Sequence, residues 1–149
     1  MLGELNNRQI EFILGSVIVG RIGCHAKGKT YVVPVTYAYD GKYIYGHTSE
    51  GLKIDMMREN PEVCFQVDVI DNMSNWRSVI SWGTFEELKG VEERKEAVKI
   101  LRDTVMPVMT GNTTIKHAMR DSHHQANEAL SGVVYRIELT TKTGRYEKV

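Results

Sequence analysis

The sequence has few of the features that mark several large classes of protein. Its two cysteines, Cys24 and Cys64, lie in apolar, strand-like contexts that are typical of reduced thiols, with a disulfide between them as the alternative. Nineteen acidic and nineteen basic side chains cancel, which gives no reason to expect binding to nucleic acid or to an anionic membrane. No apolar run approaches the roughly 18 residues of a membrane-spanning helix, and the first eight residues lack the layout of a signal peptide. We therefore expect a cytoplasmic protein with a single domain over residues 1–149.

Residues 43–53 combine a strand, a hydroxyl-rich loop and the start of a helix. Thr48 and Ser49 are suitable N-cap residues for a helix over residues 49–60, which Pro61 would end. Lys53 then falls in the first helical turn, where the helix dipole disfavours a cation. Hydroxyls, free backbone N–H groups and a lysine together favour an anion site. The alternative is a solvated lysine on a surface helix.

The rest of the chain reads mostly as strands. A short helix is expected after Asn6, because Asn6 and Gln9 form a capping-box pattern. Strands are expected over residues 17–26, 31–39, 63–69, 76–88 and 133–139, and a helix over residues 92–105. Pro34 cannot donate to a sheet ladder, so its strand is predicted to be bulged or at an edge. Hairpin turns without a strand–helix–strand rhythm predict an antiparallel barrel or sandwich.

Several short motifs occur in order along the chain: residues 28–37, the Asp40-Gly41 turn, residues 47–53, residues 60–67 and residues 76–79. Together they resemble the pyridoxamine 5'-phosphate oxidase-like flavin-binding split barrels, and specifically the branch of nitroimidazole-resistance (Nim-type) proteins. The resemblance covers residues 6–88 well and the last third loosely. It implies a mainly β fold, a six-stranded antiparallel Greek-key split β-barrel with a few short helices, and a homodimer with two flavins at the subunit interface.

The resemblance also implies which residues bind the flavin. One strand would lie along the ring and the ribityl chain, a second segment would hold the phosphate, and a third would reach the same flavin from the partner subunit. The strand residues are Val33, Pro34, Val35, Thr36 and Tyr37, the phosphate residues are Gly46, His47, Thr48, Ser49 and Lys53, the residues from the partner are Trp76, Arg77 and Ser78, and Gln66 is a further member. The structural alternatives are an edge marker for Pro34, a core aromatic for Trp76 and an ordinary strand residue for Ser78.

By this resemblance the protein is an FMN-dependent oxidoreductase, with FAD as the alternative cofactor, that reduces small molecules such as nitroaromatic (5-nitroimidazole) compounds. Its final residues lack the Arg-x-His-x-Arg motif of the true pyridoxamine phosphate oxidases, which argues against pyridoxamine phosphate as substrate. A non-catalytic flavin- or haem-binding protein for sensing or storage is the alternative.

Two sets of histidines are candidates for chemistry. His47 has a side chain suited to proton transfer within the proposed site, and the alternative is a hydrogen bond that braces the loop. A metal site would draw on His117, Asp121, His123 and His124. Adjacent histidines point apart on either a helix or a strand, so we expect no metal there.

Overall fold

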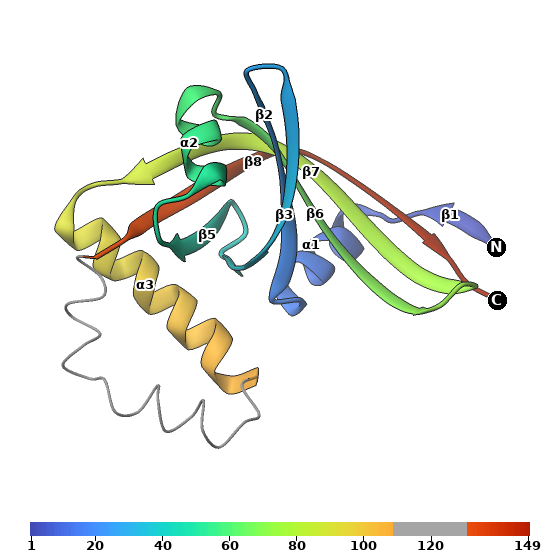
Figure 1. Cartoon of the computed structure of the whole chain (residues 1–149). Coiled ribbons are helices and arrows are strands. Elements are labelled where there is room, and N and C mark those ends of the chain that lie inside the picture. The colour runs from blue at the N-terminus through green and yellow to red at the C-terminus, as the bar shows by residue number, and fades with distance from the viewer. Residues whose placement is uncertain (109–130) are drawn as a thin grey trace.

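In the part of the chain that the structure describes, the fold is built around one antiparallel sheet with three α-helices (Figure 1). The computed structural model describes residues 1–108 and 131–149. In chain order the elements are β1 (Leu2–Glu4), α1 (Asn7–Ser16), β2 (Val19–Ala26), β3 (Lys29–Thr36), β4 (Ala38–Tyr39), β5 (Tyr43–Thr48), α2 (Leu52–Glu59), β6 (Glu62–Asn72), β7 (Asn75–Leu88), α3 (Val91–Val105), the short 3-10 helix η1 (Met106–Val108) and β8 (Val133–Glu147).

The order of the strands makes the sheet close on itself. Neighbouring strands follow the order β3-β2-β6-β7-β8-β5-β4, and β1 pairs with β8 outside this path. Strands β3 and β4 lie at opposite ends of the order, yet only Tyr37 separates them in sequence. The sheet must therefore curl until its two ends meet, as a barrel does. The predicted class, a mainly β antiparallel fold with a few helices, is confirmed, and residues 1–108 and 131–149 contain eight strands where six were expected.

Alternation along the strands sends one set of side chains into the barrel. The inner face carries fully buried residues such as Ile22, Phe65 and Ile137, and helices α1 and α2 add Leu14 and Met57 to the same core. Helix α3 instead covers part of the outer face, where Ala97 packs with Tyr45, Leu88 and Val134. The sheet thus has a filled interior and an outer face that α3 covers in part.

Large apolar side chains are exposed where α3 does not cover the outer face. Val19 and Trp82 are each 43% exposed, Val32 is 65% exposed, and Ile80 is 39% exposed. All four belong to the outward-facing sets of β2, β3 and β7, in which the neighbouring residues point into the core. Such a cluster of exposed apolar side chains on one face is typical of an interaction surface.

Several local predictions are confirmed. Asn6 and Gln9 form the predicted capping box of α1, with Gln9 N donating to Asn6 Oδ1 at 2.9 Å and Asn6 N donating to Gln9 Oε1 at 2.8 Å. Pro34 lies in β3, which is an edge strand of the sheet. Cys24 and Cys64 are free thiols, as the default expectation had it, and burial raises the pKa of the Cys24 thiol.

Two predicted boundaries were wrong, and one strand was not predicted. Helix α2 begins at Leu52 and not at residue 49, because Gly51, with φ 179° and ψ −175°, is the N-cap residue and is not helical. Strand β8 continues to Glu147, well beyond residue 139, and pairs with β1, which was not predicted. The added length of β8 and the presence of β1 both depend on pairing between residues that are distant in sequence. At the predicted bend at Gly83 the structure has a shift in the β7–β8 register.

Two further findings concern membrane-spanning helices and the residues considered for a metal site. Within residues 1–108 and 131–149, no helix combines the length and the apolar character needed to cross a membrane. The histidines and the aspartate considered for a metal site, at positions 117 to 124, lie outside the described residues.

Candidate functional site

The segment between β5 and α2 brings the proposed phosphate residues together. Lys53 is in the first turn of α2 and its Nζ donates to Thr48 Oγ1 at 3.0 Å. Gly51 occupies the N-cap position of α2, and it has no side chain that could bond to the first backbone N–H groups of the helix. Ser49 is exposed, and its hydroxyl makes no hydrogen bond within the described parts of the chain. A lysine, a free hydroxyl and uncapped N–H groups therefore meet at one helix start, where an anion is favoured.

His47 lies next to this segment and braces the start of β8. Its Nε2 is 3.0 Å from the carbonyl oxygen of Ser131. Because a carbonyl only accepts, Nε2 is the donor in this contact, and in the neutral ring Nδ1 is then the acceptor. Gly132 follows with a φ of 68°, and a Cβ there would lie 2.6 Å from the carbonyl oxygen of Thr48. The backbone of β8 thus approaches the phosphate segment too closely for a side chain at this position.

Packing explains why a glycine occupies position 46. The ring of Tyr135, which is fully buried, covers this glycine, and a Cβ at Gly46 would lie 2.2 Å from the ring. Burial also raises the pKa of Tyr135. The glycine therefore lets β5 lie flat against the core just before His47.

The residues of the edge strand β3 that were proposed to bind the flavin ring alternate between the two faces of the sheet. The side chains of Val33 and Val35 pack toward the core, whereas Pro34 and Thr36 are exposed on the outer face. Tyr37 is buried, and its hydroxyl donates to the carbonyl oxygen of Leu14 at 2.7 Å. Tyr37 is therefore part of the core and presents no exposed side chain to a ligand.

The backbone of β3 has groups that face away from the sheet. The amide of Tyr37 donates to the carbonyl oxygen of Ile18, so the odd-numbered residues of this strand bond toward β2. Pro34 and Thr36 therefore direct their backbone groups outward, and the missing N–H of Pro34 costs no ladder bond. The result is a row of backbone groups at the edge of the sheet that a planar, polar ligand can meet.

Gln66 and Ser78 belong to a polar network on the outer face. The Gln66 amide donates to Ser78 Oγ at 3.3 Å and to Asp68 Oδ2 at 2.8 Å. Arg21 Nη1 lies 3.3 Å from the same Asp68 oxygen, and Arg21 is directly opposite Pro34 in the β2–β3 register. The sequence reasoning missed Arg21 and Asp68 as members of this group. Only the alignment of β2, β3, β6 and β7 reveals them.

Trp76 and Arg77 are not members of this polar network. The indole Nε1 of Trp76 donates to Glu147 at 3.2 Å. Arg77 points to the opposite face of the sheet, where it lines a cavity of about 280 Å³ beside Phe12 of α1. Along β7, Ser78 is nine residues from Glu87, which makes about 30 Å of extended strand. Residues 76–78 are therefore far from the phosphate segment, which lies near Glu87.

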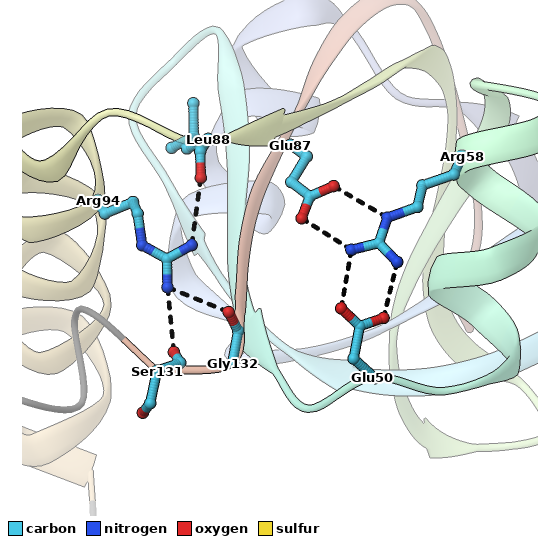
Figure 2. A network of polar contacts seen from close by, with 7 residues as sticks. All are labelled: Glu50, Arg58, Glu87, Leu88, Arg94, Ser131 and Gly132. Carbon is cyan, nitrogen blue, oxygen red and sulfur yellow. Dashed lines mark hydrogen bonds and ion pairs between the residues drawn. The ribbon is translucent and has the colours of Figure 1, made fainter.

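Arg58 connects the phosphate segment to the sheet through ion pairs with two glutamates (Figure 2). Arg58, in the last turn of α2, binds Glu87 of β7 at 2.8 and 2.9 Å and Glu50 at 2.7 and 2.9 Å. Hydrogen bonds from the guanidinium lower the pKa of both carboxyl groups. Nearby, Arg94 of α3 donates to the carbonyl oxygens of Ser131 and Gly132, each at 3.1 Å.

The outer face also contains an open groove. Its volume is about 540 Å³, and it runs over β2, β6 and β7 beside the exposed side chains of Val32 and Trp82. Its polar lining includes His25, Glu62 and three threonines, Thr30, Thr84 and Thr140. Among the described residues, no group of histidine, cysteine and acidic side chains is arranged to hold a metal ion.

Comparison with known proteins identifies the relatives of this chain. The family model described as pyridoxamine 5'-phosphate oxidase matches residues 6–146. The uncharacterized protein RA0666 of Rhizobium meliloti (strain 1021) is 30% identical over 88 residues, which cover 59% of this chain and only 58% of that protein.

Two solved structures share the fold over nearly the whole chain. A FAD-binding protein from Mesorhizobium loti has 28% sequence identity and a TM-score of 0.74, and the match covers 99% of each chain. A candidate 5-nitroimidazole antibiotic resistance protein from Bacteroides thetaiotaomicron has 19% identity and a TM-score of 0.75, with 98% of this chain and 87% of that chain covered. The predicted split-barrel class is thereby confirmed.

Proposed function

The chain belongs to the pyridoxamine 5'-phosphate oxidase family, and from this membership we propose that it is a flavin-dependent oxidoreductase. The observation that carries the proposal is the pairing of Lys53 with Thr48 at the uncapped start of α2. That arrangement suits the phosphate of a flavin nucleotide. We propose FMN as the cofactor, although the FAD-binding relative from Mesorhizobium loti makes FAD the form to test beside it.

The residues present fit a phosphate chemically. The ammonium of Lys53 uses one N–H on Thr48 and keeps two for an anion, and the Ser49 hydroxyl adds a further donor. A charge-assisted bond of this kind contributes about 1.5–3 kcal/mol. Bound flavin would supply the electron or hydride transfer, and the protein would bind it, orient it and exclude water.

We propose that the ring end of the flavin lies along the edge of β3. The outward backbone groups of Pro34 and Thr36 are suited to the polar rim of the ring, and the Arg21–Asp68–Gln66 network lies on the adjoining outer face. This face also exposes Val32 and Trp82, which a second copy of the chain would cover. We therefore propose a homodimer with flavin at the interface, in which the partner's residues 76–78 approach the flavin.

The proposed substrate is a small nitroaromatic compound such as a 5-nitroimidazole. The fold shared with the candidate resistance protein of Bacteroides thetaiotaomicron supports this choice. We propose His47 as the proton-exchanging side chain, because the bond of Nε2 to Ser131 holds the ring and leaves Nδ1 to accept a proton and return it.

The absorption spectrum of the purified protein tests the cofactor. Protein incubated with FMN or FAD and then desalted should retain about one flavin per chain and show flavin bands. A colourless protein without measurable affinity for either flavin would refute the proposal, and a Soret band would redirect it to haem. If flavin binds, reoxidation of the reduced flavin by a nitroimidazole should be faster on the protein than for free flavin. No acceleration by any acceptor would favour sensing or storage instead.

A further inference from the structure

Arg58 links three elements that surround the proposed phosphate site (Figure 2). Its Nε and Nη2 bind the two carboxylate oxygens of Glu87, and its Nη1 and Nη2 bind those of Glu50. Both contacts are bidentate, which a guanidinium can achieve and an ammonium cannot. Glu87 is the fixed end of this chain of contacts, because it belongs to β7 and its side chain is only 19% exposed.

Glu50 is the exposed end of the same contacts. It lies in the stretch between β5 and α2, without regular structure, and its side chain is 63% exposed. Within the described residues, its hydrogen bonds to Arg58 are the only ones that this carboxylate makes. The position of the stretch that includes Ser49 and Gly51 therefore depends on Arg58.

The charge of Glu50 opposes the proposed ligand. Glu50 is three residues before Lys53, so a free carboxylate there would repel an anion held by Lys53 and Ser49. The guanidinium of Arg58 neutralises this charge while it is bound. Without Arg58, Glu50 would lose its two hydrogen bonds, and Glu87 would keep only the electrostatic influence of Lys89 and Arg94.

We propose that Arg58 is a positioning residue of the flavin phosphate site, which holds Glu50 in place and screens its charge from the phosphate. The proposal rests on the proposed flavin function, since it assigns Arg58 a part in the same site. Arg58 does not touch the phosphate in this scheme. It acts through Glu50, and the carboxylate, once paired, no longer competes with the anion for Lys53.

The test compares FMN with riboflavin, which has the same ring and lacks the phosphate. Arg58→Gln should weaken FMN binding by about tenfold through lost screening and lost ordering, and should change riboflavin binding by less than about twofold. The double variant Arg58→Gln/Glu50→Gln should recover most of the lost FMN affinity. Arg58→Lys keeps the charge but cannot make both bidentate contacts, so it should weaken FMN binding by about threefold and leave riboflavin binding unchanged. Titration of flavin fluorescence measures all of these affinities.

The control variant is Arg136→Gln. Arg136 also pairs with a glutamate of β7, Glu86, at 2.8 Å, and its loss changes the net charge equally. It should leave the preference for FMN over riboflavin unchanged.

Two outcomes would refute the role of Arg58: equal weakening of FMN and riboflavin by Arg58→Gln, or no recovery in the double variant. The Arg58→Lys variant keeps the test valid if Arg58→Gln does not fold. If the wild-type protein binds riboflavin as tightly as FMN, the proposed phosphate site itself is refuted.

Discussion

Replacement of Lys53 by alanine is the most direct test of the anion site. The ammonium is anchored on Thr48 at 3.0 Å, so it is held in place before a ligand binds. Its loss removes a charge-assisted hydrogen bond worth about 1.5–3 kcal/mol, which corresponds to about a ten- to hundredfold weaker affinity for FMN. The free energy of unfolding without flavin should change by less than about 1 kcal/mol, because the lost bond to Thr48 is offset by the removal of a cation from the positive end of the helix dipole.

Fluorescence titration with FMN, combined with urea unfolding of the flavin-free protein, separates the two effects. Lys95→Ala is the matched control, since Lys95 is an exposed lysine of α3. It should leave the FMN affinity unchanged. Thr48→Val removes the anchor and keeps the lysine, so we expect an intermediate loss of affinity. Unchanged FMN affinity in Lys53→Ala would mean that α2 does not begin at an anion site.

Three further predictions address other parts of the proposal. His47→Ala should retain bound flavin and slow turnover with a nitroimidazole in stopped-flow assays, whereas loss of flavin would assign His47 to bracing alone. Trp82→Glu should weaken dimerisation by about tenfold or more in sedimentation experiments, because it places a charge on the exposed apolar face, and an unchanged dimer would exclude this face as the interface. Because Arg58 lowers the pKa of Glu50 and Glu87 from the ordinary 4.5, their contribution to stability is present above that pH and disappears as the pH falls through the lower folded-state values. The unfolding free energies of the unchanged protein and Arg58→Gln should therefore differ at neutral pH and converge in acid, and a difference that persists in acid would contradict the assignment.

The parts of the fold that depend on neighbouring residues could be predicted from the sequence. The capping box of Asn6 and Gln9 is complete within four residues, and the edge position of Pro34 follows from its missing N–H. Lys53 could be connected to Thr48 for the same reason, since one segment contains both. In each case the pattern and its partner are close together in sequence.

The parts that depend on strand register could not be predicted. Arg21 lies beside Asp68 only because β2 and β6 pair as they do, and 47 residues separate the two in sequence. Arg58 reaches Glu87 across 29 residues in the same way. Strand alternation also separates Arg77 from Ser78, which a linear motif treats as one group. Local patterns carry no information about such alignments.

The central place of β8 has a consequence for how the protein is made. This strand pairs with β1, β5 and β7, and it is translated after all three of them. The earlier strands therefore leave the ribosome with exposed edges, and Tyr135 and Ile137 are not yet present to fill the barrel. Contacts between residues so far apart, such as Leu2 with Glu147, form slowly because a long loop must close first. The nascent chain thus cannot complete its sheet before β8 emerges, and during this interval its open strand edges are exposed to chaperones and to aggregation.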